Sequence, residues 1–277
     1  MPELPELEVL CEVLRRRVVG QTIASVRVFP PGGPIVVRDL THEGLDTALT
    51  GASVSGVKRR GKFLIFTFGS SSLNLAINPK LTGRLQLAST GEKRMARTHV
   101  AFSFRDALEL RYVDQKQMGQ VYLTRDLDLV PDYATLGPEP FDLTLDEFRT
   151  RLKPFRGEIK GVLTRGECVA GIGNAYADEI LWAARLHPYR KRTQLTPDET
   201  ERLFNAMHTT LAEATDQVRN EMGENIHLKP REFLAVHMKT GEPCPRCGTT
   251  ISLVGANQRI TNFCRNCQPG GLIKGMA

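Results

Sequence analysis

The first segment of the chain carries apolar residues at every third or fourth position. Over residues 3–19 these positions are Leu4, Leu7, Leu10, Leu14 and Val18. This spacing places the apolar side chains on one face of a helix with 3.6 residues per turn. The pattern therefore predicts an amphipathic helix over residues 3–19.

The pattern changes at about residue 22 and keeps its new form to residue 123. Short runs rich in β-branched and aromatic residues are separated by Gly, Pro, Asp and Ser. The runs read IASVRVF, ASVSGV, FLIFTF, LNLAI, HVAFSF, LELRYV and QVYL. Many short strands with turn residues between them predict an antiparallel β-sandwich or barrel.

The second half of the chain has helical signals. Residues 124–140 have no period and contain several Pro and Asp residues, as is typical of a linker. Two capping boxes follow, in which a Thr precedes a Glu by three residues. The predicted helices begin after Thr144, span Ala175–Arg185, and run from Thr196 to about Arg219.

These patterns predict an α+β protein with an N-terminal helix, a β-domain, a linker, a helical domain and a C-terminal ribbon. We place the β-domain at residues 1–125, the linker at 126–143, the helical domain at 144–236 and the ribbon at 237–277. The order contains no internal repeat and no low-complexity tail.

Charge narrows the set of partners. The 277 residues carry a net charge of +6, and the pI is about 9.1. This excess of positive charge favours a polyanionic partner, and nucleic acid is favoured over an acidic membrane surface. The alternative is a basic enzyme without such a partner. No run approaches 18 apolar residues, and the acidic, amphipathic N-terminus does not have the pattern of a signal peptide.

Four of the six cysteines form two Cys-x-x-Cys pairs. The first pair is Cys244 and Cys247, and the second, after 16 further residues, is Cys264 and Cys267. This spacing is typical of a zinc ribbon, and four thiolates complete the tetrahedral shell of the metal. We therefore expect one structural Zn²⁺. The remaining cysteines, Cys11 and Cys168, stand alone and are expected to be small buried apolar residues.

The N-terminus offers a candidate nucleophile. Removal of Met1 makes the ring nitrogen of Pro2 a secondary amine, and Glu3 and Glu6 follow directly. An amine beside a carboxylic acid is suited to Schiff-base chemistry on the aldehyde carbon of a sugar. The alternative is ordinary, because Pro and Glu are both common in the first turn of a helix.

Three further positions are candidates for phosphate contacts. Asn174 follows the glycines of Val169–Tyr176 and opens a predicted helix, where backbone N–H groups suit a phosphate. Lys62 enters an apolar strand from a basic run, where its charge can hold a phosphate and help keep the amine of Pro2 unprotonated, so it is a candidate catalytic residue as well. Arg259 lies at the predicted tip of the ribbon hairpin. The alternatives are a tight turn at Asn174, a solvated face at Lys62 and a solvated turn at Arg259.

Together these motifs resemble the formamidopyrimidine-DNA glycosylase / endonuclease VIII family of base-excision repair. The resemblance covers nearly the whole chain and five motifs in order. They are Met-Pro-Glu-Leu-Pro-Glu at 1–6, Arg-Gly-Lys at 60–62, Leu-Gly-Pro-Glu-Pro at 136–140, Gly-Ile-Gly-Asn-x-Tyr at 171–176 and the cysteine ribbon at 243–268.

The resemblance implies a β-sandwich, a helix-two-turn-helix domain with a zinc finger, and damaged double-stranded DNA as the partner. It implies that the amine of Pro2 attacks C1′ of the damaged nucleotide, with Glu3 assisting ring opening and Glu6 supporting it. Elimination at both flanking phosphates then combines glycosylase and abasic-site lyase activities. By the same resemblance, Lys62, Asn174, Arg259 and Lys160 contact the DNA.

The chain departs from the family at the residues that fill the gap left by the flipped nucleotide. The loop that commonly reads His-Leu-x-Met-x-Gly is Asn78-Pro-Lys-Leu-Thr-Gly83, and Asp-Pro-Arg-Arg-Phe-Gly is replaced by Asp114-Gln-Lys-Gln-Met-Gly119. The expected gap-filling residues are therefore Leu81, Lys116 and Met118. Residues 222–230 also lack the family's Gly-Gly-[Ser/Thr]-Thr loop.

These departures leave three hypotheses. The first is a bifunctional glycosylase and lyase with β,δ-elimination. The second is the same scaffold with divergent specificity for an oxidised pyrimidine, abasic or bulky lesion. The third is a zinc-ribbon protein that binds damaged DNA without catalysis, which gives no reason to keep Pro2, Glu3 and Glu6 together. We expect a monomer in the bacterial cytoplasm, associated with the nucleoid.

Overall fold

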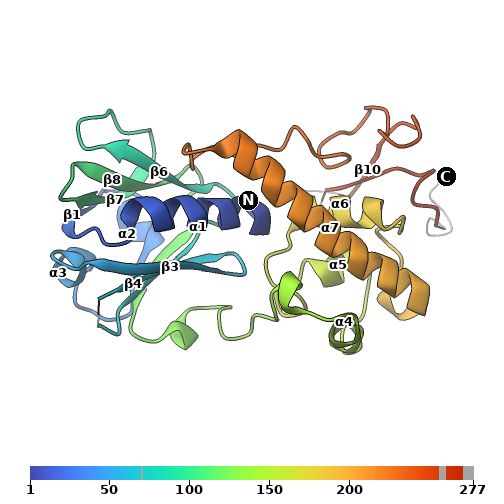
Figure 1. The fold of residues 1–277 in the computed structure, drawn as a ribbon, viewed down its shortest axis with the longest axis horizontal. Coiled ribbons are helices and arrows are strands. Elements are labelled where there is room, and N and C mark those ends of the chain that lie inside the picture. The colour runs from blue at the N-terminus through green and yellow to red at the C-terminus, as the bar shows by residue number, and fades with distance from the viewer. Residues whose placement is uncertain (70, 256–259, 271–277) are drawn as a thin grey trace. The chain divides into compact units, whose positions relative to one another are not determined.

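The structure, a computed structural model, describes residues 1–69, 71–255 and 260–270. The chain forms two compact units (Figure 1). The first unit contains Met1–Thr135 and Val218–Pro230, and the second contains Leu136–Gln217 and the chain from Arg231. The predicted division into four segments stays a prediction.

The first unit is the predicted β-sandwich. One sheet has the strand order β1-β7-β8-β6 and the other has the order β2-β9-β5-β4-β3. The strands of the first sheet are β1 (Ile23–Val28), β6 (Gly83–Ser89), β7 (Thr98–Phe104) and β8 (Leu108–Asp114). Those of the second are β2 (Val37–Asp39), β3 (Val54–Arg60), β4 (Phe63–Phe68), β5 (Asn74–Asn78) and β9 (Gln120–Thr124). Short helices α2 (Gly33–Val36) and α3 (Leu45–Leu49) connect β1, β2 and β3.

Helix α1 (Leu4–Val18) confirms the first prediction. Its five periodic apolar residues are all at most 4% exposed, and the helix runs beside the sandwich against β3 (Figure 1). Burial of these side chains, worth about 1.5–3 kcal/mol each, fixes the helix on the sandwich. The start of α1 is thereby held in one place.

Two strands were not among the predicted runs. β6 begins at Gly83 and contains Arg84 and Gln86, so it lacks the β-branched and aromatic residues that mark the other strands. β2 has only three residues and pairs with β9 in parallel, which differs from the predicted antiparallel arrangement. β2 and β9 lie more than 80 residues apart in the chain, so no hairpin turn determines their relative direction.

The second unit contains the predicted helices. A short 3₁₀ helix at Leu127–Leu129 precedes this unit. A second at Pro140–Asp142 lies near its start, and a third lies at Arg192–Gln194. The α-helices are α4 (Leu145–Leu152), α5 (Ile159–Leu163), α6 (Asn174–Ala183) and α7 (Pro197–Met222), whose last residues belong to the first unit. Both predicted capping boxes form, because Thr144 and Glu147 exchange hydrogen bonds, as do Thr196 and Glu199. Cys168, and Cys11 in the first unit, are fully buried as predicted.

The ribbon closes the second unit. β10 (Ser252–Val254) pairs with β11 (Thr261–Phe263) in antiparallel fashion, and the four cysteines flank this hairpin. Arg259 lies outside the described residues, so its predicted place at the hairpin tip stays a prediction. Across the described part of the chain, none of the helices combines the length and the apolar character of a membrane span.

Candidate active site and metal centre

The start of α1 brings together the three N-terminal candidates. The backbone N–H of Glu3 donates to the Glu6 carboxylate at 2.8 Å, which is half of the capping box that these two residues form. Glu3 and Glu6 are only 1% and 2% exposed. Because the box satisfies orphan backbone donors at the first turn, it holds two carboxylates at fixed positions beside Pro2.

A cavity of about 50 Å³ lies at this point. Pro2 and Glu6 contribute to its wall, so a candidate nucleophile and a candidate acid face the same space. The wall also contains Leu81, one of the expected gap-filling residues. The other lining residues are Leu10, Pro79, Thr82, Gly83, Arg84, Leu85, Met222, Ile226, Leu228 and Lys229.

The segment at 222–229, where the chain departs from the family, contributes Met222, Ile226, Leu228 and Lys229 to this wall. The end of α7 is fixed on α1 by a paired contact, since two Arg219 nitrogens each lie 2.9 Å from a Glu12 oxygen. Further on, Arg84 donates to the carbonyl of His227 at 3.2 Å. The two contacts join residues 207 and 143 positions apart in the chain, and no local pattern signals them. The loop that departs from the family therefore borders the candidate active site.

The remaining candidates of the first unit lie on two loops and a turn. Lys116 and Met118 are exposed on the β8–β9 loop, and the side chain of Met118 is 42% exposed. Lys62 is partly buried at the β3–β4 turn, where Gly61 adopts φ +55°. None of these three residues lines the cavity around Pro2.

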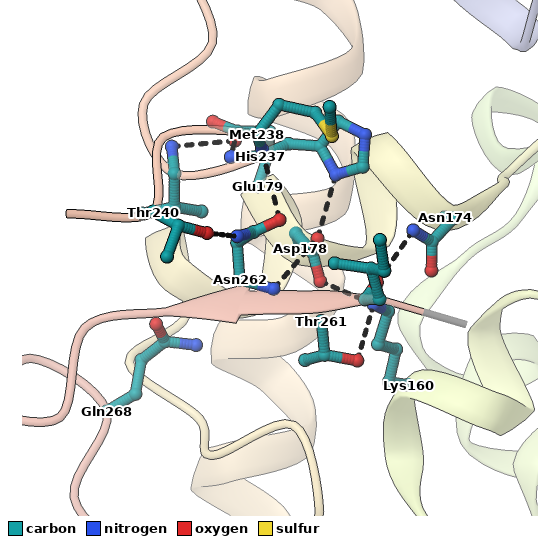
Figure 2. A network of polar contacts seen from close by, with 12 residues as sticks. Lys160, Asn174, Asp178, Glu179, His237, Met238, Thr240, Thr261, Asn262 and Gln268 are labelled. Atoms are coloured by element: carbon teal, nitrogen blue, oxygen red, sulfur yellow. Dashed lines mark hydrogen bonds and ion pairs between the residues drawn. The ribbon is translucent and has the colours of Figure 1, made fainter. Parts of the chain in front are cut away.

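In the second unit, Asn174 opens α6 as predicted. Its side-chain amide donates to the carbonyl of Ile260 at 2.8 Å, which ties the start of α6 to the start of β11 (Figure 2). Gly173 has an extended backbone at the N-cap. The first turn of α6 and the hairpin strand therefore form one connected surface within this unit.

Lys160 lies in a buried polar network of the second unit. Its side chain is 8% exposed and its ammonium lies 2.7 Å from the Asp178 carboxylate. It also donates to the Ile260 carbonyl at 2.9 Å and to the Thr261 hydroxyl at 2.8 Å. Two protein acceptors and the charge of Asp178 therefore surround the ammonium. The position therefore gives Lys160 a structural role within this unit, and its DNA contact stays a prediction.

Asp178 is the centre of this network, which Figure 2 shows. Its second oxygen lies 2.9 Å from Nδ1 of His237 and accepts from the Asn262 backbone N–H at 3.2 Å. The neighbouring carboxylate of Glu179 accepts three backbone N–H groups from residues 235–237. One turn of α6 thus fixes both β11 and the segment that leads into the ribbon.

The four ribbon cysteines meet the geometric requirement of a metal site. Their Sγ atoms all lie within 4.8 Å of one another. Three of the Sγ pairs are 3.8, 3.5 and 3.4 Å apart, and a tetrahedron with Zn–S bonds of 2.3 Å has edges of about 3.8 Å. The residues fit one Zn²⁺ with a closed shell, and its contribution is to cross-link the two knuckles.

Side chains around the cysteines hold the ligands in place. The indole N–H of Trp182 on α6 points to Sγ of Cys244 at 3.4 Å, and Arg246 stacks over the same indole at 3.9 Å. Gln268, 1% exposed, accepts from the backbone N–H of Cys264 and donates to the Leu186 carbonyl. Such outer contacts orient metal ligands, and here they also attach the ribbon to α6.

Comparison with known families agrees with this architecture. A model of the formamidopyrimidine-DNA glycosylase N-terminal domain matches residues 1–121. A model of the H2TH domain of the same enzyme matches residues 136–223. A third, the zinc finger found in FPG and IleRS, matches residues 241–270. The β-domain, the helical domain and the ribbon therefore each match a domain found in formamidopyrimidine-DNA glycosylase.

Full-length relatives and solved structures show the same similarity. Formamidopyrimidine-DNA glycosylase of Symbiobacterium thermophilum is 37% identical, over 97% of this chain and 90% of the relative. That of Bacillus cereus is 36% identical, over 97% and 99%. Lactococcus lactis FPG (MutM) in complex with Fapy-dG containing DNA has a TM-score of 0.86 at 33% identity. MutM in complex with carbocyclic 8-oxo-G containing DNA has a TM-score of 0.84 at 33% identity. Each comparison covers 97% of this chain and 100% of the solved chain.

A β-sandwich with paired buried carboxylates beside a proline, followed by a helical domain and a four-cysteine finger, defines a DNA glycosylase of base-excision repair that is also an abasic-site lyase. The chain belongs to the formamidopyrimidine-DNA glycosylase family. The predicted family, fold class, enzyme class and single structural zinc are confirmed.

Proposed function

We propose that Pro2 is the nucleophile of this glycosylase, acting through its ring nitrogen once Met1 is removed. The observation that carries the proposal is the cavity whose wall contains Pro2 and Glu6, with Glu3 buried in the same capping box. A carboxylate held at a fixed place beside an amine is suited to move protons during attack and ring opening.

The reaction proceeds in balanced steps. The bond from the Pro2 nitrogen to C1′ forms while the glycosidic bond breaks, and the damaged base leaves with a proton. Glu3 delivers a proton as the sugar ring opens, and loss of the proton on nitrogen leaves an iminium ion. The iminium makes the C2′ proton acidic, so that first the 3′ phosphate and then the 5′ phosphate are eliminated. Water releases the sugar fragment and restores the amine.

Borohydride trapping tests the nucleophile, because borohydride reduces the iminium to a stable adduct. Wild-type protein forms a covalent complex with abasic DNA, and Pro2→Gly forms far less. Pro131→Gly, a change of an exposed proline, traps like wild type. Trapping by Pro2→Gly at the wild-type level would identify another amine, such as that of Lys62, as the nucleophile.

The same substrates separate the role of Glu3 from that of Pro2. Glu3→Gln slows base excision by about 100-fold, a typical contribution of a positioned acid. It slows cleavage of a preformed abasic site less, because no base has to leave. Equal losses on both substrates would contradict the assignment of Glu3 to base release and ring opening.

We propose that the partner is damaged duplex DNA, as in the solved complexes of the relatives. Lys62, Asn174 and Arg259 are assigned to its phosphates, which supply affinity without sequence preference. The net charge of +6 supports such contacts. Lys62 lies in the first unit and Asn174 in the second, and Arg259 lies outside the described residues. The relatives are bacterial, and we place the enzyme at the nucleoid in the cytoplasm.

We further propose that lesion preference differs from that of the 8-oxoguanine enzymes. The expected gap-filling residues Leu81, Lys116 and Met118 offer no aromatic face and no bidentate guanidinium. The divergent segment 222–229 also borders the cavity at Pro2. Weak discrimination of the opposite base follows, with better activity on lesions that already unstack or unpair.

A lesion panel tests this preference. Single-turnover rates are measured on 8-oxoguanine, formamidopyrimidine, oxidised-pyrimidine and abasic duplexes, each opposite all four bases. The expected result is a low ratio between opposite bases and slow excision of 8-oxoguanine paired with cytosine. Fast excision with a strong preference for cytosine would show that the substitutions in the two loops are functionally silent.

A further inference from the structure

Two loops of the first unit carry the residues expected to fill the gap in the DNA. Leu81 lies on the β5–β6 loop, and Lys116 and Met118 lie on the β8–β9 loop. We propose that Asp114 is a positioning residue that holds these two loops together as one preorganised wedge for nucleotide extrusion. This proposal rests on the proposed glycosylase function and on the gap-filling roles of the three residues.

The Asp114 carboxylate contacts both loops. On the β5–β6 side it accepts a short hydrogen bond from the Thr82 hydroxyl. On the β8–β9 side it accepts from the backbone N–H of Lys116 at 3.2 Å and of Gly119 at 2.8 Å. The Thr82 hydroxyl also accepts from the Lys116 N–H at 3.0 Å. Thr82 therefore bridges directly from one loop to the other.

Buried groups hold the Asp114 carboxylate in place. Asp114 and Tyr112 are fully buried, and the Tyr112 hydroxyl donates to Asp114 at 3.2 Å. Burial, and then the charge of Asp114, raise the pKa of Tyr112 above its ordinary value, so that the phenol keeps its proton as a donor. On the other side, Nε2 of His99 lies 2.8 Å from the Asp114 carbonyl.

Close packing brings the two loops onto the same tyrosine. A Cβ added at Gly83 or Gly119 would lie 2.4 or 1.9 Å from the Tyr112 hydroxyl oxygen. The same atoms would lie 2.4 and 2.9 Å from the Pro79 carbonyl. Only glycine leaves room for this approach. Both loops are therefore anchored within a few ångström of one buried phenol.

The anchored loops have strained backbones and exposed tips. Lys80 and Gln117, one on each loop, have φ angles of +47° and +54°, a region that residues with a side chain occupy only when their surroundings determine it. Met118 is 42% exposed, whereas Asp114 is fully buried. Lys116 and Met118 thus project from a fixed base, while Leu81 is half-buried at the cavity.

Preorganisation has a direct consequence for extrusion. A loop that is already ordered does not lose conformational freedom when it enters the gap, so more of its contact energy opposes the cost of unpairing and unstacking. Loosening the connection between the loops should therefore slow excision of a stacked, paired lesion. It should matter little where the lesion is already unpaired.

Thr82→Val tests this role, because it removes the bridging hydroxyl with little change in volume. Single-turnover excision of 8-oxoguanine is measured opposite cytosine and in a one-nucleotide bulge. Thr82→Val slows the paired substrate by about tenfold, the factor that corresponds to one ordinary hydrogen bond. The bulged substrate is slowed much less, because its lesion is already unpaired. Thr82→Ser, which retains the hydroxyl, restores excision of the paired lesion.

Controls separate the possible outcomes. Thr67→Val changes a threonine of the same sandwich that contacts Ser55 and Gly56, and both of its rates stay at the wild-type level. Asp114→Asn, which keeps the shape of the side chain, provides a second variant with the same expected selectivity if Thr82→Val does not fold. Equal slowing of both substrates, or no slowing, would overturn the positioning role. Absence of borohydride trapping by wild-type protein would instead refute the proposed function itself.

Discussion

Lys160 offers a sharp test of the structure, because two roles predict opposite results for one substitution. Lys160→Met keeps the length of the side chain and removes the ammonium. The 2.7 Å ion pair with Asp178 is lost, together with two hydrogen bonds to Ile260 and Thr261. Removal of one partner from a buried ion pair costs about 3–5 kcal/mol.

The remaining contacts of Asp178 determine where in this range the loss of stability falls. After the substitution Asp178 keeps its contacts with His237 and with the backbone N–H of Asn262, so its charge is not left without partners. A loss of about 3 kcal/mol, at the lower end of the range, is therefore expected. For a protein of this size such a loss lowers the Tm by roughly 5 °C.

The assay combines thermal unfolding with DNA binding at several salt concentrations, measured below the Tm of every variant. A lysine on a phosphate contributes roughly one unit to the salt slope of binding. We expect Lys160→Met to lower the Tm and to leave this slope unchanged. Lys153→Met, at an exposed lysine of the same unit, should leave the Tm unchanged.

A double-mutant cycle with Asp178→Asn adds a second requirement. Since the two side chains contact each other, the double variant should lose less stability than the sum of the single variants. An unchanged Tm with a salt slope lower by about one would refute the structural role of Lys160 and restore the DNA contact that the sequence predicts.

Three further predictions concern the metal, a buried carboxylate and a glycine. Cys264→Ser should lose the zinc and tight DNA binding, because zinc binding supplies on the order of 10 kcal/mol to folding of the ribbon, while circular dichroism still shows a folded sandwich; active protein without zinc in a metal analysis would contradict this. Burial alone would raise the pKa of Glu109, but the hydrogen bond and charge of Arg111 hold it below its usual value. The stabilisation by ionised Glu109 is therefore present above the unfolded pKa near 4.3 and is lost as the pH falls through the folded pKa. Glu109→Gln should accordingly lower the free energy of unfolding at pH 7 and flatten the decline of that free energy in acid. Urea titrations that show the wild-type decline in acid for this variant would contradict the prediction. Gly119→Ala places a Cβ 1.9 Å from the Tyr112 hydroxyl and should cost about 1–3 kcal/mol, which thermal unfolding measures; a Tm equal to that of wild type would show that the loop relaxes freely.

Local sequence patterns predicted the elements that are stabilised by interactions between residues close together in the chain. Helix α1 follows from apolar spacing alone, and both capping boxes follow from a Thr and a Glu three residues apart. The cysteine cluster follows from two short spacings, because zinc geometry determines which spacings close a shell. In each case the residues that interact are neighbours in the chain or are drawn together by one ion.

Long-range contacts explain what the sequence did not predict. The placement of residues 222–229 at the cavity depends on Arg219 and Glu12, and the burial of Lys160 depends on Asp178 and on the start of β11. A basic residue at a position that suits DNA binding gives no sign of an acidic partner elsewhere in the chain. Strand β6 was missed for a different reason, because its residues have weak strand propensity and its neighbour β8 determines its structure.

The difference between local and long-range contacts also separates the catalytic residues of this enzyme from the residues expected to recognise damage. Pro2, Glu3 and Glu6 are placed by one helical turn, so their relation to one another survives changes elsewhere in the chain. The wedge depends on a buried carboxylate that joins two loops about 30 residues apart. Substitution at the tips, Leu81, Lys116 and Met118, leaves that base intact. The lesion preference can therefore change at these three residues while the catalytic turn and the anchor of the wedge stay fixed.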